Sequence, residues 1–241
     1  MTLYDRIGRN YARHRTPEPA IAARIWDAIG ASQRVVNIGA GTGSYEQAGW
    51  IAVEPSQVMI AQRPAGANRV VAAFAESLPF EPGCFDVAMA VLSVHHWADP
   101  AAGLREIRRV AERSVIFSFD VSLLHERFWL VRDYVPEMAS LESHVPPPER
   151  IAEITGASHI DPVPLPAGCS DGFLAAYWAR PEAFLDPSVR SAISLFHRLD
   201  AGVVRRMVSH LSEDLASGRW ERRNHDLRGL DELDLGFRLI W

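Results

Sequence analysis

The sequence predicts an α/β fold built on a doubly wound, mostly parallel sheet, and three observations predict it. Short apolar segments alternate with amphipathic segments through the first half of the chain, as expected of β-α-β units. The apolar segments are hydrophobic nearly throughout, which is typical of strands covered by helices on both faces. A glycine-rich loop follows the first of them, at residues 39–43.

The predicted elements follow from this alternation in chain order. We expect strands at residues 34–38, 51–54, 69–73, 87–93 and 114–120, with a last strand at 235–241. We expect helices at 4–15, 18–29 and 101–111, an aromatic-rich helix at 128–134, and later helices at 188–199 and 203–215. Helices placed this late are predicted to form a lid over the carboxyl edge of the sheet, where open α/β sheets bind ligands.

Length and composition predict one domain, residues 1–241. Within it we expect an N-terminal helical arm (1–33), a ligand-binding core (34–120), the remaining core with lid insertions (121–234) and the final strand (235–241). The net charge of −5 offers no positive field for nucleic acid or an anionic membrane. No leader or spanning segment is evident, so a cytoplasmic location is expected. Cys84 and Cys169 lie far apart, which argues against a metal site, and the oligomeric state is left open.

The glycine-rich loop is the most informative motif. Residues 35–44 read VVNIGAGTGS, with Gly39, Gly41 and Gly43 spaced as G-x-G-x-G. Glycine lets backbone pass close to a ligand because it has no Cβ and tolerates positive φ. Dinucleotide-binding loops need a glycine or alanine where this chain has Ser44, so an NAD(P)-dependent oxidoreductase is a disfavoured alternative. A plain linker turn is the other alternative.

A carboxylate is predicted beside this loop. Glu54 ends the second predicted strand and is followed by Pro55 and Ser56. If the first two strands are parallel neighbours, Glu54 lies next to the loop, where its two oxygens can accept hydrogen bonds from both hydroxyls of a ribose. A solvated acid at a strand end is the alternative reading of this residue alone.

Two further segments carry a resemblance to a known family. Residues 75–80 read AESLPF, and residues 85–97 run from Phe-Asp through an apolar strand to His-His-Trp. With the G-x-G-x-G loop, residues 35–120 resemble the class I S-adenosylmethionine (SAM) dependent methyltransferases. Within them, the resemblance is to the family of the ubiquinone and menaquinone biosynthesis C-methyltransferases and related small-molecule methyltransferases. It implies a Rossmann-like, seven-stranded sheet.

The resemblance implies SAM as cofactor and assigns residues to it. The cofactor-binding candidates are Tyr11, Arg15, Asn37, Gly39, Ala40, Gly41, Gly43, Glu54, Pro55, Ser56, Ala75, Glu76 and Ser93. Two positions depart from the family. Asn37 stands where an acid usually helps hold the cofactor's ammonium group, although its amide oxygen can still accept a hydrogen bond. Phe74 replaces the acid before Ala75 and Glu76, so adenine recognition is expected to rest on the Ala75 backbone and on packing.

His95 and His96, at the exit of the fourth predicted strand, are the candidate catalytic residues, because histidine can take a proton near neutral pH. Adjacent strand residues face opposite ways, so one of the two is expected to point away, and His96 is favoured as the base. Asp120 and His125 are second-line candidates.

The acceptor is expected to be a small apolar or aromatic molecule, because aromatic residues are predicted near the methyl site. The substrate-binding candidates are Trp97, Trp129, Tyr134 and Trp178. The sequence does not choose among O-, N- and C-methylation. A SAM-binding protein that does not transfer methyl groups is the remaining alternative, because it would keep every cofactor motif.

Overall fold

A computed structural model describes residues 4–7 and 15–241 and contains a seven-stranded sheet in the order β3-β2-β1-β4-β5-β9-β6. The strands are β1 Val35–Ile38, β2 Ile51–Val53, β3 Val70–Val71, β4 Phe85–Val91, β5 Ala111–Phe119, β6 Ile160–Pro162 and β9 Phe237–Ile240. Strands β1 to β5 pair in parallel, whereas β9 is antiparallel to both β5 and β6. The predicted doubly wound, mostly parallel sheet is confirmed.

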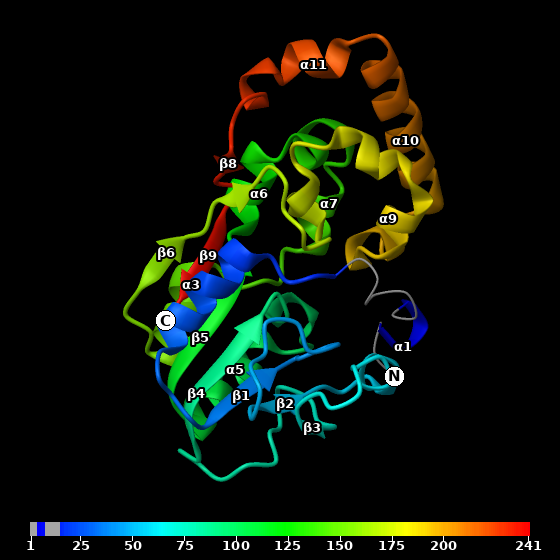
Figure 1. Cartoon of the computed structure of the whole chain (residues 1–241). Coiled ribbons are helices and arrows are strands. Elements are labelled where there is room, and N and C mark those ends of the chain that lie inside the picture. The colour runs from blue at the N-terminus through cyan, green and yellow to red at the C-terminus, as the bar shows by residue number, and fades with distance from the viewer. Residues whose placement is uncertain (1–3, 8–14) are drawn as a thin grey trace.

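Helices cover both faces of the sheet (Figure 1). On β4, Val87 and Met89 pack into a core shared with α3 (Pro19–Ile29), whereas Ala88 and Ala90 pack on the other side with α5 (Pro100–Val110) and α8 (Pro148–Thr155). Because successive strand residues point to opposite faces, a continuous apolar strand fills both cores. The apolar run predicted as a strand therefore folds as expected.

Local sequence signals set the helix boundaries. The Glu18 side chain accepts a hydrogen bond from Ala20 N at the start of α3, and Gly30, with φ of 65°, ends it. Asp99 caps α5 in the same way, through Ala102 N. Side-chain acceptors at N-caps and glycine after the last turn are common helix signals. The predicted helices at 18–29 and 101–111 are both found, shifted by a residue at most at either end.

The structure describes residues 4–7 and Arg15 of the helix expected over residues 4–15, and the rest of that prediction lies outside the described residues. Helix α1 spans Tyr4–Ile7 and packs against α4 (Gln57–Ile60), where Ser56 Oγ donates to Asp5 Oδ1 at 2.7 Å. Arg15 is extended and forms an isolated β-bridge with Asp171. The arm therefore contacts the β2 side of the sheet at one end and a late segment of the chain at the other (Figure 1).

The lid consists of two insertions. The first contains α6 (Val121–Arg127), a π-helical turn (Leu130–Tyr134) and α7 (Met138–Leu141). The second follows β6 and contains β7 (Leu165–Pro166), η4 (Leu174–Tyr177), η5 (Pro181–Leu185), α9 (Pro187–Ser191), η6 (Ser194–His197), α10 (Ala201–Ala216), α11 (Arg219–Arg223), η7 (His225–Leu227) and β8 (Glu232–Leu233), with β7 and β8 paired antiparallel. Figure 1 shows α7, α9, α10 and α11 gathered beyond one end of the sheet.

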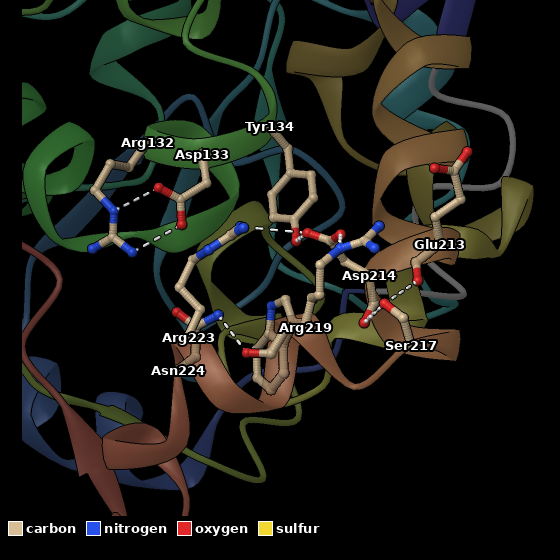
Figure 2. Close-up of polar contacts among 10 residues, drawn as sticks. Arg132, Asp133, Tyr134, Glu213, Asp214, Ser217, Arg219, Arg223 and Asn224 are labelled. Carbon is tan, nitrogen blue, oxygen red and sulfur yellow. Dashed lines mark hydrogen bonds and ion pairs between the residues drawn. The ribbon is translucent and has the colours of Figure 1, made fainter.

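Buried aromatic side chains of the lid are part of the hydrophobic core that also contains Val87 and Met89 of the sheet, and this corrects part of the predicted acceptor site. Trp129 and Trp178 are buried, and Trp129 Nε1 donates to the Trp178 carbonyl at 2.8 Å. The Tyr134 hydroxyl donates to Asp214 Oδ2 at 2.8 Å, and Arg219 pairs with the same carboxylate (Figure 2). None of these three aromatic side chains lines a described cavity. These side chains hold the two insertions together, because each large aromatic side chain buries a large apolar surface.

Within the described part of the chain, every helix is too short or too polar to cross a bilayer.

Candidate functional site

A cavity of about 420 Å³ lies at the carboxyl ends of β1, β2 and β4. The cavity is lined by five stretches of chain at this edge of the sheet, which are residues 39–42, 44–45, 54–55, 74–76 and, except for Val94, 91–98. The remaining walls are Asn37 on β1, Met59 on α4, Tyr4 and Arg15 of the arm, and His144 and Arg198 of the lid. Parallel strands place their loops at one edge, which explains why segments far apart in sequence meet here.

The glycine-rich loop forms the floor of this cavity. Gly39 N and Ala40 N both donate to the Val53 carbonyl at 2.9 Å, which fixes the loop against β2. Gly39 and Gly41 have φ of 71° and 54°, and a Cβ on Gly39 would lie 2.6 Å from Ser93 Cβ. The backbone here therefore requires glycine. Gly43 lies outside the lining, where the Arg63 guanidinium covers it.

Glu54 lies beside the loop, as expected from the parallel pairing of β1 and β2. Its Oε2 accepts from Gly41 N and its Oε1 from Ser56 N, each at 2.8 Å. Burial raises the pKa of this carboxyl. Each carboxylate oxygen can accept a second hydrogen bond, so one acceptor position remains on each. Pro55 lines the cavity, whereas Ser56 is fully buried and caps α4 through Met59 N, away from the lining.

Asn37 presents an acceptor to the same cavity. Its Nδ2 donates to Glu46 Oε1 at 3.1 Å, and its buried Oδ1 has no hydrogen-bond partner among the described residues. A buried polar atom without a partner costs free energy, so this oxygen is suited to a ligand that donates a hydrogen bond. Sequence reasoning missed Glu46, which lies two residues after the glycine-rich motif at residues 35–44.

An exposed aromatic side chain also lines this cavity. Phe74 is 56% exposed and lines the cavity with Ala75 and Glu76. Glu76 Oε1 accepts from Ala98 N at 2.8 Å and Asp99 N at 3.2 Å, so this carboxylate also holds the chain after the histidines in place. Trp97 lines the cavity on the glycine-loop side, with its indole nitrogen next to Gly39.

The two histidines both face the cavity, which corrects the expectation that one points away. They lie in a 3-10 turn, Val94–His96, rather than at the end of β4. Leu92, with φ of 48°, turns the chain out of the strand, so strand alternation no longer applies. The two imidazole centroids are 3.8 Å apart, and both rings also line a second cavity of about 70 Å³.

The pKa values of both histidines are lowered. Burial, then the charge of Arg15 and other cations, lowers the pKa of His96 to about 3. Burial and the neighbouring His96 lower the pKa of His95 well below its usual value. Both imidazoles are therefore neutral at physiological pH, with one ring nitrogen each that can accept a hydrogen bond.

These shifts predict a pH-dependent stability between pH 6.5 and 5. The unfolded chain protonates its histidines near pH 6.5 and the native protein does not, so the free energy of unfolding falls as pH falls, by up to about 1.4 kcal/mol per pH unit for each histidine. Urea unfolding of the native protein and the double variant His95→Gln/His96→Gln measures this. The variant should show the shallower dependence. Burial raises the pKa values of Glu54 and Glu142, and these two groups oppose the trend equally in both proteins. Parallel curves of unfolding free energy against pH would therefore contradict the lowered pKa values of the two histidines.

The arm and the lid close the histidine side of the cavity. The Tyr4 hydroxyl lies 2.8 Å from His96 Nε2, and His144 Nε2 lies 3.0 Å from the His95 carbonyl. Arg198 Nη1 donates to Glu142 Oε1 at 2.6 Å; Arg198 lines the larger cavity and Glu142 the smaller. These residues come from segments without a recognisable motif, so the sequence held no signal for them.

A buried network joins the arm to the lid. The Arg15 guanidinium makes two contacts with the Asp171 carboxylate, which also accepts from the Tyr45 hydroxyl at 2.9 Å. Burial and the charge of Asp171 raise the pKa of Tyr45. Arg15, a predicted site residue, lines both cavities. Tyr45 directly follows the glycine-rich loop, and that position was the one available sequence signal.

Some of the remaining predicted residues line the larger cavity, and others do not. Gly39, Ala40, Gly41, Ala75 and Ser93 line the larger cavity. Tyr11 lies outside the described residues. Asp120 caps α6, and His125 on that helix lines neither cavity. Among the described residues, no cluster of three or more His, Cys, Asp or Glu side chains could hold a metal ion.

Comparisons with known proteins agree with this geometry. Residues 36–119 match the family model of a methyltransferase domain. A solved structure of a proposed methyltransferase from an antibiotic biosynthesis pathway of Anabaena variabilis is 30% identical, with a TM-score of 0.85 over 94% of this chain and 98% of that one.

Two other similarities are more limited. A Thermotoga maritima protein described as a SAM-dependent methyltransferase, possible histamine N-methyltransferase, is 22% identical, with a TM-score of 0.53 over 68% of this chain and 84% of that one, which shows the same fold. The uncharacterized Escherichia coli protein YafE is 49% identical over 37 residues, or 15% of this chain, and that match spans only 18% of YafE.

Proposed function

The chain belongs to the class I SAM-dependent methyltransferases, and we propose that it methylates a small-molecule acceptor bound between the histidine turn and the lid. The observation that carries this proposal is the position of His95 and His96, which line both cavities at once. One cavity has the features of a nucleoside site, and the other is small and largely apolar. A methyl donor and its acceptor would meet at these two side chains.

The residues of the larger cavity fit SAM. The volume of about 420 Å³ falls within the range of small-molecule pockets. Glu54 keeps one acceptor position on each oxygen for a sugar diol, and the unpartnered Asn37 Oδ1 suits an ammonium donor. Glycine at 39 and 41 leaves room that a side chain would take. Phe74 offers an exposed ring on which a nucleobase can pack.

The chain's contribution to the reaction is positioning and exclusion of water. Bound SAM supplies an electrophilic methyl group on a sulfonium, which is transferred by in-line displacement. The arm, through Tyr4 and Arg15, and the lid, through Arg198, wall the cavity on the side where the acceptor would enter. Holding the nucleophile close and in line, away from water, is the main source of acceleration in such a transfer.

His96 is proposed to receive the proton of an acceptor that arrives protonated. Its imidazole is neutral above about pH 3, so a ring nitrogen is open to a proton across the physiological range. Tyr4, 2.8 Å from His96 Nε2, would orient this imidazole. The low pKa makes His96 a weak base, which favours acceptors that need little help to lose a proton, such as a neutral amine that becomes acidic on methylation or an acidic hydroxyl.

The acceptor is proposed to be small and at least partly apolar. The second cavity, about 70 Å³, is walled mainly by Leu92, Phe119, Phe173 and other apolar side chains. It is smaller than the roughly 150 Å³ that holds a benzene ring, so it would take a branch of the acceptor rather than an aromatic ring. The AESLPF segment additionally suggests kinship with the quinone C-methyltransferases, as a proposal on sequence alone.

Replacing His96 by alanine should lower turnover by about a hundredfold while leaving S-adenosylhomocysteine affinity within about threefold. The reason is that His96 lines the smaller, acceptor-side cavity, where its Nε2 lies 2.8 Å from the Tyr4 hydroxyl of the arm. Turnover and calorimetric affinity are measured side by side. His125→Ala, on α6 outside both cavities, is the matched control. Native turnover in His96→Ala would remove its role as base.

The proposed function is tested by a labelled-methyl screen. The native protein is incubated with methyl-labelled SAM and fractionated metabolite extracts, and transfer of label to a small molecule is expected. SAM binding without transfer to any fraction, polymer included, would favour the alternative of a SAM-binding protein with other chemistry. Tight NAD(P) binding with no response to SAM would overturn the proposal.

A further inference from the structure

A buried carboxylate beside the glycine-rich loop is saturated with donors from three side chains. Glu46 Oε1 accepts from Asn37 Nδ2 at 3.1 Å and from Arg63 Nη1 at 3.2 Å. Its Oε2 accepts from Arg63 Nη2 at 2.6 Å and Asn68 Nδ2 at 3.0 Å. The Glu46 and Arg63 side chains are only 5% and 4% exposed. A carboxylate offers about four acceptor positions, so all of them are used.

This saturation fixes which way the Asn37 amide points. An ionised carboxylate can only accept hydrogen bonds, so the atom of Asn37 that faces Glu46 must be the amide nitrogen. The amide oxygen then faces away from Glu46. Asn37 lines the large cavity, and its Oδ1 is buried with no partner among the described residues. The orientation therefore presents an acceptor, not a donor, to a ligand in that cavity.

We propose that Glu46 is a positioning residue that locks the Asn37 amide so that its oxygen receives the ammonium group of the cofactor's amino acid. This inference rests on the proposed function, because it assumes that SAM occupies the cavity. An unlocked amide could turn its NH₂ group toward the ammonium and repel it. The family's acid at this position needs no such lock, since both of its oxygens accept. Glu46 and Arg63 together thus let a neutral side chain replace a charged one.

Two ligands separate this role from a general structural one. S-Adenosylhomocysteine carries the ammonium group, whereas 5′-methylthioadenosine keeps the nucleoside and thioether without the amino acid. In Glu46→Gln the new amide can donate to Asn37 and allow it to turn. Calorimetry should then show S-adenosylhomocysteine binding about tenfold more weakly, with 5′-methylthioadenosine within about threefold of its native affinity.

A second variant tests the orientation itself. Asn37→Asp in the Glu46→Gln background presents an acceptor whichever way the side chain turns, and it should restore S-adenosylhomocysteine affinity to within about threefold of native. If Glu46→Gln alone does not fold, this double variant carries the test, and a selective loss of S-adenosylhomocysteine binding in it would overturn the proposal. Asn68→Ala removes a donor from the same carboxylate without touching Asn37, so it should show no selective loss.

The outcomes distinguish the inference from the proposed function. Equal weakening of both ligands in Glu46→Gln, no weakening of either, or a selective loss that Asn37→Asp does not restore would each overturn the positioning role while leaving the SAM site intact. If the native protein binds neither ligand, the proposed function itself fails, and the role of Glu46 fails with it.

Discussion

Gly41→Val is expected to weaken S-adenosylhomocysteine binding by about a hundredfold or more. Gly41 has φ of 54°, a conformation that a β-branched residue strongly resists. A Cβ there would also lie 3.3 Å from Met59 Cε. The Gly41 amide donates to Glu54 Oε2, so a displaced loop would also move the carboxylate that is proposed to hold the ribose. Calorimetric titration measures the loss.

Gly66→Val is the matched control for this substitution. Gly66 has φ of 80°, and a Cβ there would meet no atom within 4 Å. It therefore carries a similar conformational cost, about 1–2 kcal/mol for a left-handed residue, without touching the cavity. The thermal unfolding temperature should fall in both variants, whereas the affinity for S-adenosylhomocysteine should fall only in Gly41→Val. Native affinity in Gly41→Val, or equal losses in both, would contradict the loop's assignment.

Asp171→Ala is expected to lower the free energy of unfolding by about 3–5 kcal/mol, as for a broken buried ion pair. The Asp171 side chain is fully buried, and its carboxylate holds both Arg15 and the Tyr45 hydroxyl. Alanine would remove this carboxylate from both the Arg15 guanidinium and the Tyr45 phenol. Urea unfolding monitored by tryptophan fluorescence measures the change.

The control is an ion pair on the surface. Arg150 and Glu153 pair at 2.5 Å with side chains 52% and 67% exposed, and such pairs contribute at most about 1 kcal/mol. Glu153→Gln should therefore leave stability nearly unchanged. If Asp171→Ala cost no more than Glu153→Gln, the network joining arm, glycine loop and lid would not be the stabilising element that its burial indicates.

The sheet could be predicted because its signals are local. A nearly continuous apolar run, such as the strand predicted at 87–93, is typical of a strand covered by helices on both faces, and β4 is found two residues earlier, at Phe85–Val91. The spacing of Gly39, Gly41 and Gly43 restricts the loop. Glu54 could be placed because the carboxyl ends of neighbouring parallel strands meet at one edge. The alternation of β4 could not be extended to the histidines, because Leu92 turns the chain out of the strand.

The acceptor side could not be predicted because long-range packing builds it. Trp129 and Trp178 are expected in a pocket, yet both are buried in the core that the insertions share with the sheet, because burial of large apolar surface stabilises the fold. Glu142 and Arg198 meet across the lid, and Asp171 contacts Arg15 although 156 residues separate them in sequence. No sequence pattern specifies such pairs. The domain boundaries stay a prediction.

A crystal structure of the native protein grown with S-adenosylhomocysteine tests the central claim most directly. We predict density for the ligand in the cavity of about 420 Å³, with the sugar at Glu54 and the amino acid at Asn37. An empty cavity under saturating ligand, or the ligand bound elsewhere, would contradict the account.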